Sequence, residues 1–362
     1  MRLLNLIKSR NRLLKNIHYV KFTAVTPLWT GDAFRNSEGN SLETGVIGSL
    51  RWWTEVLVRG MGIPVQDPTT GASGQTSEDP THLETIFGQT DRQRRFRLTL
   101  EGGKEFAFPT TRTSGRYVFE LPIVNSRGTK PSWQFPSKAR AGQMELRTLD
   151  LHPDRPGPAP ETLVSLLLNV VSKVGGLGAR TQHGCGIIQT EPSRDPEQLF
   201  KWLSPLWIKG QGRRVNPELP SLRNCFVGEF RAKGERNLYN WLDTFWARYH
   251  LRGAFRPDPD SPAAKDLRHF LFGTLRPEHI GSKINVSFPF NTNQDALRVR
   301  VWGWIPETAN RSAHLKTIRA VMETHFNLEG WKDLVDWYAS GSNPVDKLSN
   351  LLESGASPWN IP

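Results

Sequence analysis

Residues 161–174 (ETLVSLLLNVVSKV) carry apolar side chains on nearly every face, and a glycine-rich loop follows them directly. A helix that is apolar all round is typical of a buried position rather than of the protein surface. The loop, GGLGARTQHGCG (175–186), contains five glycines and leads into a short strand predicted over 187–190. Glycines in such a loop allow the backbone to approach a neighbour closely.

The elements before this helix complete a recognisable order. Alternating, β-branched runs predict strands over 18–26, 95–100 and 144–149, and apolar residues at helical spacing predict a helix over 44–59. The order strand, helix, strand, strand, helix, strand is typical of a ferredoxin-like fold. The second half repeats this theme loosely, with strands over 222–231, 283–290 and 297–305 and helices over 237–250, 263–272, 313–326 and 329–339. The fold class that we expect is α+β, with two ferredoxin-like (RRM-like) domains in tandem and loop insertions.

The length of 362 residues suits two domains at roughly 150 residues each. We predict a basic N-terminal arm over 1–17, a first domain over 18–195, a proline-containing linker over 196–220 and a second domain over 221–362. The first domain carries an insertion over 102–142 that has few acids, Glu105 and Glu120. Its basic residues predict an arm that projects toward a partner; they are Lys104, Arg112, Arg116, Arg127, Lys130, Lys138 and Arg140.

The composition narrows the class of partner. Lys and Arg number 47 and Asp and Glu 35, a formal net charge of +12, which favours a polyanionic partner. The two cysteines, Cys185 and Cys225, exclude a disulfide framework and a cysteine-rich zinc site. No apolar run approaches the ~20 residues of a membrane span, so we expect a soluble, cytoplasmic protein with no membrane partner.

The glycine-rich loop has two interpretations. Its backbone N–H groups and the Arg180 guanidinium would suit a phosphate, or the glycines would only form a tight structural turn. The loop is neither a dinucleotide fingerprint nor a phosphate-binding Walker loop, because it does not run from a strand into a helix and no Gly-Lys-Ser/Thr follows.

The helix TGVIGSLRWWTEVLVRG (44–60) is the second candidate. Arg51, Glu55 and Arg59 recur at four-residue spacing, which suits either a solvated charge ladder or a phosphate-binding face. The buried stripe passes through Trp53, so we expect Trp52 to face outward and to be available for stacking on a base. In a ferredoxin-like unit this helix and the 175–186 loop begin near the same strand end. We therefore expect Arg51 and Arg180 to flank one RNA path.

Four segments in this order resemble the RAMP superfamily of CRISPR proteins: FTAVTPLWTGDA (22–33), GVIGSLRWWTEVLVRG (45–60), IFG (86–88) and the 175–186 loop. Within it, the sequence is most similar to the first-subunit family of the type III-B (Cmr) effector complex. The resemblance implies a pair of RRM-like folds in a ribonucleoprotein. Its partners would be guide RNA, held near the 3′ end, the paired target RNA and the other RAMP subunits of the Cmr complex.

The resemblance implies RNA contacts from the helix and the loop, and no cofactor, metal or small-molecule substrate. The expected RNA-binding residues are Arg51, Trp52, Arg59, Gly175, Gly176, Gly178, Arg180, Thr181, His183, Gly184 and Gly186.

Two alternatives to an RNA-binding subunit remain. His183 is the candidate catalytic residue of a metal-independent RAMP endoribonuclease that processes guide precursors, but no second His or Tyr lies at a recognisable spacing from it. Asp32 is the other candidate, because RAMP filament subunits cut with an acidic loop residue, but it does not lie in a recognisable motif. We therefore expect no enzymatic activity. The other alternative is a basic scaffold that binds only protein partners.

Overall fold

The structure is a computed structural model. It describes residues 17–30, 43–65, 83–88, 92–108, 111–113, 116–124, 128–135, 138–191, 196–210, 216–233, 239–256, 261–274, 281–291, 297–306, 310–335, 346 and 348–349. The predicted N-terminal arm, apart from Ile17, and Asp32 lie outside these ranges. Among the helices within them, none combines the length and apolar composition that a membrane span requires.

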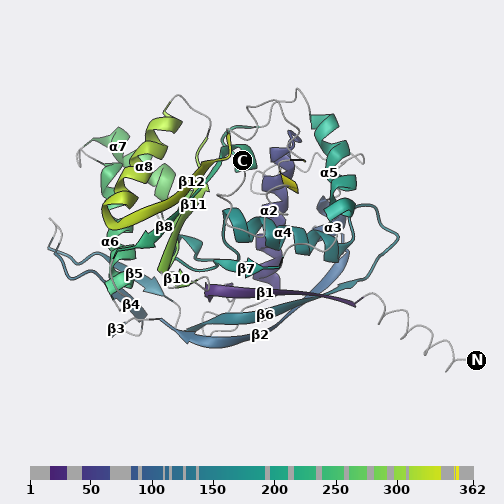
Figure 1. Cartoon of the computed structure of the whole chain (residues 1–362), viewed down its shortest axis with the longest axis horizontal. Helices are drawn as coiled ribbons and strands as arrows, with labels where there is room; N and C mark the ends of the chain where they lie inside the picture. Colours follow the sequence, from purple (N-terminus) through teal and green to yellow (C-terminus); the bar gives the residue numbers. More distant parts are fainter. Residues whose placement is uncertain are drawn as a thin grey trace, which may run out of the picture.

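The first antiparallel sheet has the strand order β2-β6-β1-β7. Its strands are β1 (Ile17–Leu28), β2 (Phe96–Ala107), β6 (Lys138–Asp150) and β7 (Ile188–Thr190). Helices α2 (Glu43–Gly60), α3 (Leu83–Phe87) and α4 (Pro160–Val174) lie on one face of this sheet (Figure 1). The order β1-α2-β2-β6-α4-β7 follows the element order predicted for the first half. Alternation explains the exposed opposite face, because Phe96, Leu98 and Leu100 are buried while the residues between them are not.

The second sheet has the order β10-β11-β8-β12, with β9 paired to β11. The strands are β8 (Cys225–Ala232), β9 (Ile284–Val286), β10 (Phe290–Asn291), β11 (Leu297–Trp304) and β12 (Phe326–Asp333). The helices of this half are α6 (Tyr239–Ala254), α7 (Pro262–Phe272) and α8 (Arg311–His325).

The helix predicted over 329–339 is wrong in its first part, because β12 runs to Asp333 and pairs with β8. The Trp331 ring stacks on Phe226 at 5.6 Å and also meets the ring of Phe230. Strand pairing and burial of this indole against the sheet outweigh the local helix preference. A register shift between Leu328 and Gly330 accommodates the turn of the chain.

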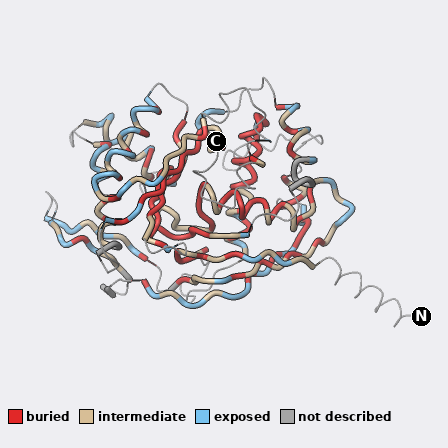
Figure 2. The backbone as a smooth tube through the Cα atoms, viewed as in Figure 1, coloured by how far each residue is buried: buried red, intermediate tan, exposed pale blue. Residues whose placement is uncertain are grey.

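One core joins the two halves. Trp302 and Phe290 from the second half belong to the same buried cluster as Trp53 of α2 and Leu167 of α4. The Trp53 and Trp302 rings lie 5.8 Å apart. Buried backbone is concentrated where α2, α4 and β8 meet (Figure 2). Helix α4 is apolar all round because the first sheet covers one side and the second half covers the other.

The segment 196–220 is more than a linker. It contains α5 (Pro196–Gly210), whose Leu203 and Leu206 are buried in the same cluster. The proline content predicts a linker, but apolar residues at helical spacing form a helix whose apolar face packs against the core.

The insertion over 102–142 is docked rather than projecting. β2 and β6 extend into it, pairing as far as Ala107 and Lys138, and it adds a sheet of β3 (Thr111–Thr113), β4 (Arg116–Glu120) and β5 (Ser132–Phe135). We call β3-β4-β5 the insertion sheet. The Phe119 ring stacks on Phe245 of α6 at 4.0 Å, and Trp133 lies 5.0 Å from the same ring. The excess of basic residues predicted an arm, but aromatic packing holds the insertion against the second half.

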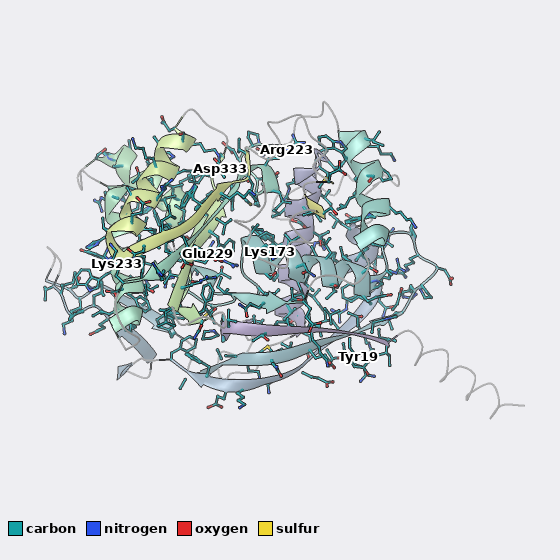
Figure 3. The ribbon with its side chains drawn as sticks, viewed as in Figure 1. Tyr19, Lys173, Arg223, Glu229, Lys233 and Asp333 are labelled. Atoms are coloured by element: carbon teal, nitrogen blue, oxygen red, sulfur yellow. The ribbon has the colours of Figure 1, made fainter. Side chains whose placement is uncertain are left out.

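A buried ion pair connects the second sheet to the end of α4. Arg300 of β11 and Glu229 of β8 are register partners, and the guanidinium Nε donates to Glu229 Oε1 at 3.1 Å. The Arg300 Nη1 donates to the Ser172 carbonyl at 2.8 Å, in the last turn of α4. Glu229 and the neighbouring Lys173 lie at the centre of the molecule (Figure 3). Burial, followed by repulsion from Arg300, lowers the pKa of Lys173.

Arg300→Met is expected to lower the free energy of unfolding by about 3 kcal/mol, because it removes the hydrogen-bonded partner of the buried Glu229 carboxylate and leaves the looser contact with Arg298 at 3.9 Å. Arg319→Met is the matched control: Arg319 pairs with Glu323 on the exposed face of α8. An exposed pair of this kind contributes less than about 1 kcal/mol. Urea unfolding of both variants measures the difference, and equal losses would contradict a structural role for the buried pair.

Candidate functional site

The glycine-rich loop lies directly against α2, as the element order predicted. The Trp53 indole Nε1 donates to the Gly176 carbonyl at 3.0 Å, and the Gly178 amide donates to Ser49 Oγ at 3.1 Å. These contacts join residues more than 120 positions apart. The helix and the loop therefore form one continuous surface.

Most of the loop glycines serve packing inside the protein. A Cβ at Gly175 would lie 2.0 Å from the Trp53 ring, and one at Gly176 would lie 3.0 Å from Trp302. Gly178 and Gly186 have φ of +82° and +88°, and a Cβ at Gly186 would lie 2.1 Å from the Leu177 carbonyl oxygen. Only glycine combines this backbone conformation with such close approach.

Most of the loop N–H groups that were expected to bind a phosphate donate hydrogen bonds within the protein. The Gly175 amide donates to the Val171 carbonyl, the Gly184 amide to Thr181 and the Gly186 amide to Pro27. These three glycines are also buried in the free chain, and their predicted contacts with RNA stay predictions. The structural-turn interpretation explains them.

The charged residues at four-residue spacing on α2 form ion pairs with one another inside the fold. Glu55 is buried, and its two carboxylate oxygens accept from Arg51 and Arg59 at 3.2 Å each. Arg59 is 2% exposed and also donates to the carbonyls of Val65 and Pro220, so its guanidinium is engaged inside the protein. Arg51 remains partly exposed, with Nη1 donating to the Gly88 carbonyl just after α3.

A cleft of about 510 Å³ opens where α2, the glycine-rich loop and β11 meet. Trp52 and Trp53 of α2 and Trp302 and Trp304 of β11 line it. Trp53 is buried and Trp52 is half-buried, as the helical phase predicted. The Trp52 and Trp53 rings pack edge to face with centroids 4.9 Å apart. We refer to this hollow as the tryptophan cleft.

A small set of polar groups shares the tryptophan cleft. Thr181 Oγ1 donates to Asn285 Oδ1 at 3.0 Å, and the Lys283 ammonium lies 5.1 Å from the centre of the Trp304 ring. Burial lowers the pKa of Lys283 to about 8, so most of this ammonium is charged at pH 7. Glu218 also lines the cleft. An aromatic hollow with one cation suits a base and its phosphate.

Arg180 and His183 face a different neighbourhood from Arg51. Arg180 has φ of 56°, its guanidinium lies 4.8 Å above the Trp29 ring, and Nη1 donates to the Gln134 carbonyl of β5 at 3.1 Å. The same Nη1 lies 3.4 Å from His183 Nδ1. Arg51 instead donates to the Gly88 carbonyl after α3, so the two guanidinium groups contact different elements of the fold, and the shared RNA path stays a prediction.

The environment of His183 holds the ring neutral. Burial, followed by repulsion from Arg248, Arg180 and Arg252, lowers the pKa of His183 well below its usual range. Its interacting charged neighbours are arginines, and the other candidate catalytic residue, Asp32, lies outside the described ranges. Within those ranges no group of three or more His, Cys, Asp or Glu side chains is arranged to hold a metal ion.

Sequence reasoning missed the second-half lining of the cleft: Lys283, Asn285, Trp302 and Trp304. Alternation in LRVRVWGW does put Trp302 and Trp304 on one face of a strand. Nothing local to that strand indicates that the face meets α2.

The family comparison matches residues 21–189, the segment that contains the first sheet, α2, α4 and the glycine-rich loop, to the RAMP superfamily. The matched residues make up slightly less than half of the 362-residue chain, and over them the chain is similar to the RAMP superfamily. This RAMP segment includes every motif that carried the resemblance. No curated protein sequence matches the chain.

Three solved structures similar to this chain share little sequence identity with it. The crystal structure of apo Cmr1 from Pyrococcus furiosus is 14% identical, with a TM-score of 0.41, over 90% of this chain and 96% of that chain. A chain of the type III-B Cmr-beta complex bound to cognate target RNA is 10% identical, with a TM-score of 0.45, over 84% of this chain and 99% of that chain. A chain of the Cmr-beta complex bound to cognate target RNA and AMPPnP, in the presence of single-stranded DNA, is 10% identical, with a TM-score of 0.46. This match covers 84% of this chain and 98% of that chain.

Gly175→Ala is expected to lower the free energy of unfolding by about 1–3 kcal/mol, because the new methyl group overlaps the Trp53 ring. Gly48→Ala is the matched control on the exposed side of α2, where an added Cβ meets nothing within 4 Å. That control should gain about 0.5–1 kcal/mol from helix propensity. Denaturant unfolding distinguishes the two, and a neutral Gly175→Ala variant would contradict the packing role.

Proposed function

We propose that the chain is a non-catalytic RNA-binding subunit of a type III-B (Cmr) ribonucleoprotein. It would hold guide RNA near its 3′ end together with the paired target RNA, beside other RAMP subunits. The motifs and the RAMP match of residues 21–189 support this family of functions. The tryptophan cleft is the observation that carries the binding role, because it joins stacking surfaces to a cation at the boundary between the two sheets.

The geometry favours binding of a splayed nucleotide. Trp52 is half-buried beside the rigid pair of Trp53 and Trp302, so its ring can accept a base without first being ordered. Stacking of a base on an aromatic ring contributes about 1–3 kcal/mol and tolerates any base. The Lys283 ammonium donates to the Phe270 carbonyl at 2.8 Å, and its remaining N–H groups would bind the phosphate that follows the stacked base.

The fold supports two ferredoxin-like RAMP units in tandem, one built on each sheet. The division into 18–195 and 221–362 follows the two sheets, with α5 packed onto the first unit. Because a shared core joins the units, the cleft between them has fixed walls. Preformed walls lower the entropic cost of binding.

Trp52→Ala is expected to weaken binding of single-stranded RNA by about 1–3 kcal/mol with the melting temperature nearly unchanged. Tyr19→Ala is the control: this ring is 56% exposed on the open face of the first sheet (Figure 3), the face that RRM domains use for RNA. Filter binding in EDTA measures both variants and reports any cleavage. Loss of affinity in Tyr19→Ala alone would indicate that RNA binds the open face of the first sheet. Cleavage of the RNA in EDTA would favour the metal-independent endoribonuclease.

RNA affinity is expected to fall as the pH rises from 7 to 9, because Lys283, with a pKa of about 8, loses its charge over this range. A bound phosphate favours the protonated form, so the decline in the complex is expected in the upper part of the range. Lys283→Met should bind more weakly at pH 7 and show a flatter profile. Lys316→Met, an exposed lysine of α8, should keep the wild-type profile. If RNA affinity depends on pH identically in Lys283→Met and in the wild type, Lys283 does not contact the RNA.

A further inference from the structure

Arg248 of α6 is a buried arginine, and within the described residues its two terminal guanidinium nitrogens have no hydrogen-bond partner. The residue is 6% exposed, and neither terminal nitrogen, Nη1 or Nη2, has a hydrogen-bond partner in the described part of the chain. The contact recorded for its guanidinium is with the ring of Phe245, 5.4 Å away and one turn earlier in the helix. Buried charges are normally paired, because desolvation of an ion costs several kcal/mol.

The neighbours of Arg248 do not neutralise it. Burial lowers its pKa to about 9; the nearby Cys185 opposes this shift, and Arg252, one turn further along α6, adds to it. Arg180 is another guanidinium close to Cys185 and His183, and its Nε is also buried without a hydrogen-bond partner. The thiol of Cys185 is neutral, since burial raises its pKa to about 12. Among the residues that the structure describes, the cluster therefore presents unpaired guanidinium nitrogens, and the pKa of Arg248 shows no compensating carboxylate.

These arginines lie where three segments of the chain meet. The glycine-rich loop supplies Arg180 and His183, α6 supplies Arg248, and the insertion sheet packs beside both. The Phe135 ring lies 5.8 Å from His183 and 5.8 Å from Phe245, and the Gln134 carbonyl accepts from Arg180. We call this region the arginine seam. It is separate from the tryptophan cleft, because none of these residues lines that hollow.

We infer that the arginine seam is a second RNA contact, a phosphate site in which a backbone phosphodiester pairs with Arg248 and Arg180. This inference rests on the proposed function. A phosphate accepts two parallel hydrogen bonds from one guanidinium, which matches the two free terminal nitrogens of Arg248. The anion would supply the charge compensation that Arg248 lacks in the free chain.

Binding in the seam requires the insertion sheet to shift. The terminal nitrogens of Arg248 are buried, so a phosphate reaches them only when a covering segment moves. The insertion sheet is held to the loop by the Arg180–Gln134 hydrogen bond and by ring contacts. A phosphate that takes over Arg180 removes that hydrogen bond. This assigns the docked insertion a role as a clamp over RNA.

The test measures melting temperature and RNA affinity on the same full-length variants. Arg248→Met should keep or raise the melting temperature, because it removes an unpaired buried charge, and should weaken RNA binding by about tenfold or more. Arg319→Met removes an equal charge on the exposed face of α8 and should leave the affinity within about twofold of the wild type. Arg180→Gln, on the half-buried loop side, is the second variant and should also weaken binding.

The outcomes separate this site from the proposed function. If the wild type binds no RNA, the proposed function fails, and this inference fails with it. If the wild type binds RNA and well-folded Arg248→Met and Arg180→Gln bind it equally well, the seam is not an RNA contact although the function stands. Stabilisation of the wild type, but not of Arg248→Met, by inorganic phosphate together with unchanged RNA affinity would show a site for a free anion and overturn the RNA assignment.

Discussion

The Arg300–Glu229 pair is the interaction on which the rest of the structure depends. Both residues lie on the inner face of the second sheet, and Arg300 extends its remaining donor to the Ser172 carbonyl in the last turn of α4. That contact satisfies a helix end that would otherwise be buried without a partner. It also fixes where α4 stops, and the glycine-rich loop begins at the next turn of the chain.

The position of the loop then determines the candidate site. Gly175 leaves room for the Trp53 ring, and Trp53 in turn packs against Trp302 of the second sheet. The tryptophan cleft exists because α2 and β11 approach each other across this contact. Its binding surface therefore belongs to neither half of the chain alone, and any change that separates the sheets would remove the cleft along with the shared core.

Local sequence patterns predict the helices and strands whose buried face is marked by the spacing of their own apolar residues. They fail where a segment is held by residues far away in the sequence. The buried helix α4, the order of the first sheet and the outward phase of Trp52 all follow from spacing within one segment. Arg59 was expected on the surface, because spacing on α2 does not reveal the distant carbonyl of Pro220 that it reaches. For the same reason, local patterns predict a helix over 329–339, a linker over 196–220 and a projecting arm over 102–142. Each acquires its structure from a neighbour far away in sequence. The predicted RNA contacts all remain predictions: Arg51, Trp52, Arg59, Gly175, Gly176, Gly178, Arg180, Thr181, His183, Gly184 and Gly186.

The central claim is that RNA enters between the two sheets. Photocrosslinking of a single-stranded RNA that carries 4-thiouridine, followed by mass spectrometry of the peptides, tests it most directly. The account predicts crosslinks to the peptides that contain Trp52 and Trp304, on opposite walls of the tryptophan cleft. Crosslinks confined to the open face of the first sheet, around Tyr19, would contradict it.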